Sequence, residues 1–210
     1  MQIHSPNIIH CLTWDCAPFS HLEQVRQLLD AGANWIQIRQ KNGSEKDKLQ
    51  VAKEAVRLAQ NYKATIIIND SPHIALESGA SGVHLGLSDT SPPDARKILG
   101  KQAIIGGTAN TPEQAAQREA EGCDYIGLGP FRATSTKENL SKVLGESGVK
   151  KVTNLHLNTP IIAIGGITPA DIPKILSLGV HGIAVSSGIV AAKNIKEAFL
   201  QHLLYYSLCQ

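Results

Sequence analysis

The segment that follows Tyr125–Leu128 combines two hydroxyl groups with a cation. Tyr125–Leu128 is an apolar run that predicts a buried strand, and Gly129-Pro130 ends it because proline lacks the N–H that a β-ladder needs. Thr134, Thr136 and Lys137 follow in the loop. Short hydroxyl donors and a lysine charge suit anionic oxygens. The loop therefore predicts an anion site, and the alternative is a solvated surface loop.

Two further cations alternate with an amide in the segment from Gln37 to Lys41. Side chains on a strand point to opposite faces in turn, so one face carries Gln37, Arg39 and Lys41, and the other carries Ile36, Ile38 and Gln40. We expect the isoleucines to pack against helices, which turns the cations toward the end of the sheet. Cations that converge there are costly unless an anion pairs with them. This predicts a second anion site; a structural salt bridge or a solvated strand end is the alternative.

Two carboxylates stand at the ends of neighbouring strands. Asp70 follows Asn69 at the end of one apolar run, and Asp89 follows the next run, which ends near His84. Magnesium is usually held by one or two carboxylates, with substrate phosphate and water completing the octahedron. We predict a Mg²⁺ site at Asp70 and Asp89. The alternative is that both aspartates cap the helices that follow them. We expect His84 to be a packed side chain rather than a ligand.

Short apolar runs alternate with amphipathic segments along the whole chain. We predict strands over Ile8–Leu12, Trp35–Arg39, Thr65–Asn69, Gly82–Leu85, Ala103–Gly107, Tyr125–Leu128, Pro160–Ile164 and Gly182–Val185. We predict helices over Ser20–Ala31, Lys46–Gln60, Pro72–Ser78, Pro92–Leu99, Thr111–Glu121, Lys151–Leu157, Pro169–Ser177 and Asn194–Tyr206. Several of these helices open on proline or on a capping residue.

A repeated glycine supports this alternation. Gly32, Gly79, Gly122 and Gly179 each stand between the end of a predicted helix and a strand that starts about three residues later. Strands that alternate with helices pair in parallel. Residues 1–210 therefore predict a single α/β domain, a (β/α)8 TIM barrel. An open doubly wound sheet is the alternative.

A barrel of this kind carries its function on the loops after the strands' carboxyl ends. Thr108 ends the fifth predicted strand, Gly165-Gly166 the seventh and Ser186-Ser187 the eighth. Glycine-rich turns after strands 7 and 8 are the usual phosphate site of this architecture, although they could be two ordinary turns. With the cations of Gln37–Lys41, the pattern predicts two phosphorylated ligands in one pocket.

Composition excludes other classes of function. Hydrophobic residues make up 42% and charged residues 18% of the 210, and the net charge of +2 is too small to favour nucleic acid. No apolar run reaches the roughly 18 residues that span a membrane, and no signal peptide is apparent at the N-terminus. Four scattered cysteines without a Cys-x-x-Cys pair predict reduced thiols in the cytoplasm. Whether the chain forms a homo-oligomer stays open.

Together these residues resemble the thiamine-phosphate synthase family, also called thiamine monophosphate synthase. The resemblance covers the chain from near Ile8 to about Ala198. It rests on Gln37-x-Arg39-x-Lys41, Asn69-Asp70, Gly82-Val-His-Leu-Gly with Asp89, Gly129-Pro130 through Thr134-x-Thr136-Lys137, Ile164-Gly-Gly-Ile and Ser186-Ser187. It implies a barrel enzyme that joins hydroxymethylpyrimidine diphosphate to a thiazole (or carboxythiazole) phosphate, releasing diphosphate and forming thiamine phosphate.

The resemblance also implies roles for individual residues. The pyrimidine diphosphate site corresponds to Gln37, Ile38, Arg39, Gln40, Lys41, Asn69, Thr108 and Lys137. The thiazole phosphate site corresponds to Thr134, Ser135, Thr136, Gly165, Gly166, Ser186 and Ser187, and the Mg²⁺ ligands to Asp70 and Asp89. Arg39, Lys41, Lys137 and Mg²⁺ are expected to neutralise the departing diphosphate. No side-chain nucleophile is required for a dissociative substitution.

Three departures and two alternatives accompany the resemblance. Gln40 stands where the family often has Glu, Leu87-Ser88 where it has Gln-Glu, and Thr108 where it has Ser. A thiazole tautomerase, an isomerase on the same barrel, typically has a histidine after the glycine of strand 6, whereas here Pro130 follows Gly129. A non-catalytic ligand-binding barrel would have no need of metal and diphosphate groups together.

Overall fold

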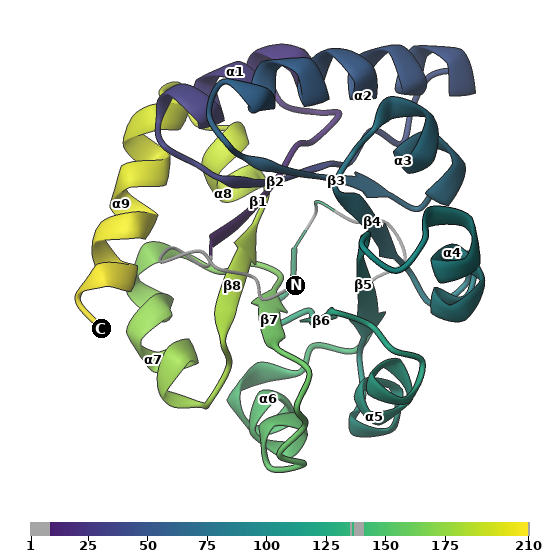
Figure 1. The fold of residues 1–210 in the computed structure, drawn as a ribbon. Coiled ribbons are helices and arrows are strands. Elements are labelled where there is room, and N and C mark those ends of the chain that lie inside the picture. The colour runs from purple at the N-terminus through teal and green to yellow at the C-terminus, as the bar shows by residue number, and fades with distance from the viewer. Residues whose placement is uncertain (1–8, 135, 137–140, 210) are drawn as a thin grey trace.

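Eight parallel strands form a closed barrel in which each strand pairs with the next and β8 pairs with β1 (Figure 1). The computed structural model describes residues 9–134, 136 and 141–209. The strands are β1 (Ile9–Leu12), β2 (Trp35–Ile38), β3 (Thr65–Asn69), β4 (Gly82–Leu85), β5 (Ile104–Ala109), β6 (Tyr125–Leu128), β7 (Ile161–Ile164) and β8 (Gly182–Val185). The predicted TIM barrel is confirmed, and the open doubly wound sheet is excluded.

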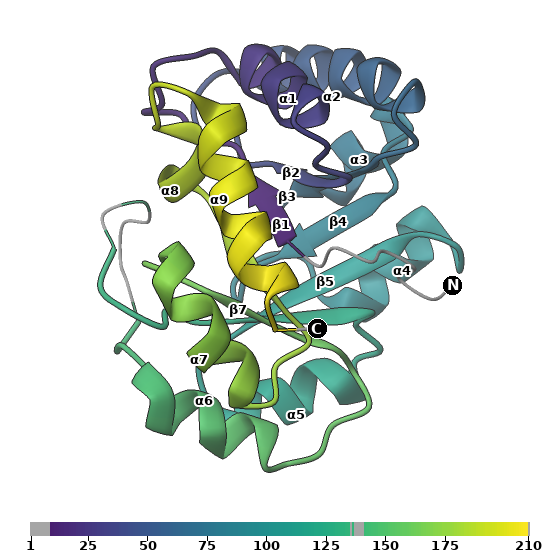
Figure 2. The same ribbon diagram turned by 90° about the vertical axis from the view of Figure 1, so that its left-hand side faces the viewer.

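Helices cover the outside of the barrel (Figure 1). They are α1 (His21–Asp30), α2 (Glu45–Gln60), α3 (Pro72–Ser78), α4 (Pro92–Leu99), α5 (Pro112–Ala120), α6 (Gly145–Thr153), α7 (Ile172–Ser177) after the 3₁₀ turn η1 (Pro169–Asp171), α8 (Ser187–Val190) and α9 (Ile195–Ser207). Figure 2 shows α9 lying along the outside, where it contacts α1, α7 and α8. Among the described residues, no helix is both long enough and apolar enough to cross a lipid bilayer.

Capping residues explain where most helices begin. Ser20, Ser44, Ser71 and Ser91 each accept a hydrogen bond from a backbone N–H in the first turn of the helix that follows, as do Thr111 and Asn194. Ser71 caps α3 and Ser91 caps α4. The alternative in which Asp70 and Asp89 serve as helix caps is therefore wrong, and both carboxylates are left for other contacts.

Alternation along the strands divides the core in two. Residues such as Ile36, Ile66, Ile105 and Ile183 point outward and pack against the helices in one large cluster. Inside the barrel lies a smaller cluster of Leu12, Trp35, Ile67, Tyr125, Ile162 and Ala184. The smaller cluster fills the lower part of the barrel, and the space above it opens into a cavity that can take a ligand.

Gly106 shows how tightly this interior is packed. A Cβ atom at Gly106 would lie 2.1 Å from Cζ of Tyr125, which faces it from the neighbouring strand. Real Cβ atoms do not approach so closely, so only glycine at this position leaves room for the buried phenol ring. The burial of Tyr125 also raises the pKa of its hydroxyl well above the usual value.

The sequence prediction for the helix before β7 was wrong. A helix was predicted over residues 151–157, but α6 spans Gly145–Thr153. Leu144 stands at the N-cap position and carries no side-chain acceptor, so the usual start signal is missing. The helix begins where Gly145 N–H donates to Phe131 O, a tertiary contact, and it buries Val149 and Val152. The short helix α8 was also not predicted as a separate element.

Candidate active site

A cavity of about 620 Å³ opens at the carboxyl ends of the strands. Its wall includes most of the predicted site residues, which come from the ends of seven strands, β2 to β8, or from the loops that follow them. These are Gln37, Arg39, Lys41, Asn69, Asp70, Asp89, Thr108, Thr134, Thr136, Gly165, Gly166, Ser186 and Ser187. Barrel closure therefore brings the two predicted anion sites and the predicted metal site to one cavity.

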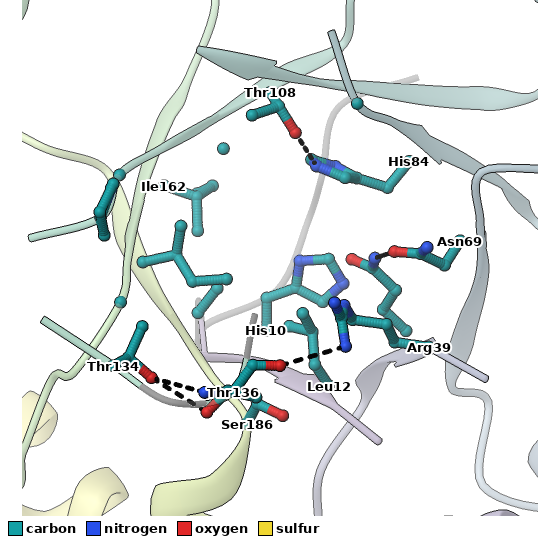
Figure 3. A pocket seen from close by; sticks show the side chains of 18 of the residues that line it. His10, Leu12, Arg39, Asn69, His84, Thr108, Thr134, Thr136, Ile162 and Ser186 are labelled. Carbon is teal, nitrogen blue, oxygen red and sulfur yellow. Dashed lines mark hydrogen bonds between the residues drawn. The ribbon is translucent and has the colours of Figure 1, made fainter. Parts of the chain in front are cut away.

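Gln37, Arg39 and Lys41 form a cationic wall on one side of the cavity. Gln37 is buried, and its Nε2 donates to Asn69 Oδ1 at 2.6 Å, which joins the ends of β2 and β3. Arg39 reaches across the cavity, where its Nη1 donates to the carbonyl oxygen of Thr136 at 3.5 Å (Figure 3). Lys41 forms an ion pair with Asp70 while keeping 48% of its side chain exposed. The wall thus presents donors that an anionic ligand can take over.

The two predicted metal ligands lie next to each other beside this wall. Asp70 has φ 67°, a left-handed conformation that aspartate tolerates better than most residues. Asp89 accepts a hydrogen bond from Gly86 N–H at 2.7 Å, which fixes its carboxylate in the loop after β4. Partial burial raises the pKa of Asp89, and the adjacent charge of Asp70 raises it further. Two carboxylates this close repel each other, and a cation bound between them would relieve that repulsion.

The donor set at this place suits magnesium. Two carboxylates supply hard oxygen ligands, and the open cavity leaves the remaining positions to water and to phosphate oxygens. No group of three or more His, Cys, Asp or Glu side chains with metal-binding geometry occurs within residues 9–134, 136 and 141–209.

A wall of hydroxyl groups and glycines faces the cations. Thr134 Oγ1 donates to Thr136 Oγ1 at 3.0 Å, and Thr136 Oγ1 lies 2.8 Å from Ser187 Oγ in the first turn of α8. Ser186 Oγ is buried beside them without a hydrogen-bond partner in the described part of the chain. Gly165 and Gly166 have positive φ and line the same wall, where Pro130 and Arg132 leave no space for a Cβ atom. These groups form a cradle for a phosphate.

The cavity floor carries a histidine that is engaged at both ring nitrogens. His84 Nδ1 lies 3.0 Å from Tyr125 Oη, and Nε2 lies 3.0 Å from Thr108 Oγ1. His10 lies deeper, stacked on Trp35 with ring centroids 4.1 Å apart, and burial holds its pKa well below the usual value. His84 is therefore packed, as the sequence predicted, and it also lines the cavity through its bond to Thr108.

Two of the predicted site residues, Ile38 and Gln40, are not part of this wall. Ile38 packs in the outer cluster and Gln40 buries Oε1 without a hydrogen-bond partner among the described residues, so neither side chain lines the cavity. Any contact of Ile38 or Gln40 with a ligand would have to use the backbone. Ser135 and Lys137 lie outside the described residues, and their predicted roles stay predictions.

Asn110 is a cavity residue that sequence reasoning missed. Its Nδ2 donates to the carbonyl oxygen of Gly129, and its Oδ1 accepts from Ser141 Oγ at 3.0 Å. It therefore holds together both ends of the loop that carries Thr134 and Thr136. The available signal was its position two residues beyond Thr108, directly after the end of β5, where the alternation of the strand would turn it toward the same side.

Comparison with known proteins agrees with this geometry. A family model described as thiamine monophosphate synthase matches residues 11–189. The chain is 47% identical over 186 residues to a thiamine-phosphate synthase of Flavobacterium johnsoniae, covering 87% of each chain. It is 45% identical over 177 residues to the thiamine-phosphate synthase of Flavobacterium psychrophilum, covering 82% of this chain and 86% of that protein.

The fold of the chain is also similar to that of a solved structure. The thiamine phosphate pyrophosphorylase of Pyrococcus furiosus superposes with a TM-score of 0.87 at 29% identity, covering 96% of both chains. The family model covers well over half of the chain, and the relatives match it nearly end to end. The chain belongs to the thiamine monophosphate synthase family.

Proposed function

We propose that this protein is a Mg²⁺-dependent thiamine-phosphate synthase. It joins hydroxymethylpyrimidine diphosphate to a thiazole phosphate or carboxythiazole phosphate and releases diphosphate. One observation carries the proposal: a cationic wall beside two adjacent carboxylates faces a hydroxyl-and-glycine cradle across one cavity, and Arg39 spans the gap to Thr136. Two anionic ligands that must react with each other need two anion sites that face each other across one cavity.

The reaction is a substitution at the pyrimidine methylene. The bond between this carbon and the diphosphate oxygen breaks, and its electron pair leaves with the diphosphate. The aminopyrimidine ring delocalises the positive charge that remains, and the lone pair of the thiazole nitrogen then forms the new C–N bond. Arg39 and Lys41 are placed to neutralise the departing charge, and the cradle of Thr134, Thr136 and Ser187 is placed to hold the thiazole phosphate in line.

Asp70 and Asp89 would hold the magnesium ion. Bound Mg²⁺ would supply Lewis-acid neutralisation of the charge that develops on the diphosphate oxygens. Lys137 is proposed as a third cation on the leaving group; Lys137→Ala should lower the rate at least about tenfold, through loss of a charge-assisted contact. We also propose a cytoplasmic location, which the free thiols of Cys11, Cys16, Cys123 and Cys209 support.

A turnover assay tests the proposal. Purified protein would receive hydroxymethylpyrimidine diphosphate, thiazole phosphate and Mg²⁺, with and without EDTA, while diphosphate release and thiamine phosphate formation are followed. We expect release that requires both substrates and stops with EDTA. An absence of release under conditions where the Flavobacterium johnsoniae relative is active would reject the synthase. Isomerisation of a thiazole tautomer by the same sample would establish the tautomerase instead.

A further inference from the structure

The loop that carries the cationic wall has no regular secondary structure, yet most of its backbone donors are bound to side chains. The N–H of Arg39 donates to Thr13 Oγ1 at 3.0 Å. The N–H groups of Lys41 and Asn42 donate to the two carboxylate oxygens of Asp15, at 3.1 Å and 3.2 Å. The loop after β1 therefore holds the loop after β2 by three hydrogen bonds.

The side chains of Thr13 and Asp15, which accept these hydrogen bonds, both contact the imidazole ring of His21. His21, the first residue of α1, has Nδ1 at 2.7 Å from Thr13 Oγ1 and Nε2 at 3.4 Å from Asp15 Oδ1. Thr13 is fully buried, and the side chains of His21 and Asp15 are only 10% and 12% exposed. Thr13, Asp15 and His21 form a unit, called the β1 brace from here on, and Thr13 N–H also donates to the carbonyl oxygen of Gln37 at 3.0 Å.

The hydrogen bonds of the β1 brace determine the tautomer of His21. Thr13 Oγ1 accepts from Arg39 N–H, so its own hydroxyl hydrogen is free to donate to His21 Nδ1. His21 Nε2–H then donates to Asp15, whose other lone pairs accept from the loop. Within this series of hydrogen bonds, every donor has an acceptor when His21 is neutral and carries its hydrogen on Nε2. Burial lowers the pKa of His21, with Asp15 partly opposing, which is consistent with the neutral form.

We infer that His21 is a positioning residue: through Thr13 and Asp15 it fixes the backbone from Arg39 to Asn42, and thereby the placement of the Arg39 and Lys41 side chains. The inference deepens the proposed function, on which its catalytic part rests. Removing the imidazole leaves the Thr13 hydroxyl without an acceptor and lets the Asp15 carboxylate turn away from the loop. Binding at the cationic wall should weaken more than binding at the cradle, because the hydrogen bonds that the β1 brace makes to the predicted substrate sites, within the described residues, go to β2 and the loop after it.

The test uses His21→Ala, the conservative variant His21→Gln, and His73→Ala as a matched control, since His73 is an exposed histidine in the first turn of α3. Backbone hydrogen exchange at Lys41 and Asn42 reports the brace directly. We expect exchange about tenfold or more faster in His21→Ala, the effect of losing one hydrogen bond, with strand amides unchanged. His21→Gln, which carries one donor and one acceptor, should restore part of the protection, and His73→Ala should match the wild type.

Steady-state kinetics provide the second readout. In His21→Ala we expect KM for the pyrimidine diphosphate to rise at least about tenfold, while KM for the thiazole phosphate changes less than about twofold. Unchanged exchange, or faster exchange with no change in either KM, overturns the inference, and so does an equal rise in both KM values. If the wild type shows no turnover, the proposed function fails on its own. In that case the role of His21 is decided by hydrogen exchange together with calorimetry. The calorimetry measures the binding of inorganic diphosphate and Mg²⁺ to the wild type and the variants and takes the place of KM.

Discussion

Arg39 Nη1 and the carbonyl oxygen of Thr136 lie 3.5 Å apart, although the two residues are 97 positions apart in the chain. This contact joins the cationic wall to the loop that carries the hydroxyl cradle (Figure 3). This contact engages one of the five N–H donors of the guanidinium, and no other hydrogen bond of these donors occurs within residues 9–134, 136 and 141–209. The same side chain can therefore report on both sides of the cavity.

Arg39→Lys should reveal whether the planar guanidinium matters or only its charge. Lysine keeps the charge but loses the fork that binds two phosphate oxygens and the reach to Thr136. We expect kcat/KM for the pyrimidine diphosphate to fall by roughly 10- to 100-fold, about 1.4–2.7 kcal/mol. Steady-state kinetics measure this change. A variant as active as the wild type would show that Arg39 acts as a simple point charge.

Asp89→Asn should separate magnesium binding from folding. The amide cannot supply a charged ligand, so the Mg²⁺ concentration for half-maximal activity should rise at least about tenfold. Burial and the charge of Asp70 raise the pKa of Asp89, so the folded state disfavours its ionised form at neutral pH. The thermal midpoint should therefore stay the same or increase.

For Asp89→Asn, titration of activity with Mg²⁺ measures the metal requirement, and a melting curve measures the thermal midpoint. A lower midpoint would mean that the Asp89 carboxylate supports the fold through Gly86 rather than serving the site. An unchanged Mg²⁺ requirement would remove Asp89 from the metal site. Ser91→Ala is a suitable control for folding, because Ser91 caps α4 two residues further on and lies off the cavity wall.

Thr136→Val should weaken the phosphate cradle selectively. Valine keeps the shape of the side chain but removes the hydroxyl that joins Thr134 to Ser187. We expect KM for the thiazole phosphate to rise about tenfold, as for the loss of one hydrogen bond to a charged ligand. Thr136→Ser, which keeps the hydroxyl, should be close to the wild type. If serine and valine have equal effects, the methyl group rather than the hydroxyl is what the site requires.

Stability should fall when the pH drops below about 6.5. Burial lowers the pKa values of His10, His21, His181 and His202, so each of these side chains takes up its proton at a lower pH in the folded state than in the unfolded chain. The unfolded chain binds protons near pH 6.5 and therefore holds more protons than the folded chain below that pH. Each such histidine contributes a slope of at most about 1.4 kcal/mol per pH unit.

Urea unfolding at pH 7.5 and pH 5.5 measures this dependence. We expect a smaller free energy of unfolding at pH 5.5, and a shallower dependence in His10→Phe, whose ring can still stack on Trp35. A free energy that rises toward pH 5.5 would contradict the prediction. Equal slopes for the wild type and His10→Phe would show that His10 binds its proton equally well in the folded and unfolded states.

Local patterns in the sequence determined the architecture and the faces of the strands. Alternation along Gln37–Lys41 was sufficient to place Gln37, Arg39 and Lys41 on the cavity wall and Ile38 in the outer core. Strand–helix alternation was sufficient for the barrel, because side-chain periodicity and capping act over a few residues. The prediction failed at α6, where the helix starts at a tertiary contact to Phe131 rather than at a capping residue.

Only the tertiary structure decided which residues meet. The adjacency of Asp70 and Asp89, the reach of Arg39 to Thr136, the hold of Asn110 on the loop after β6 and the β1 brace all join segments that no local pattern connects. Each depends on the ring of strands closing with a particular register, which sets which loops become neighbours. By itself the sequence determined a barrel with charged and hydroxyl-bearing loops; the closure of the barrel turned those loops into one cavity.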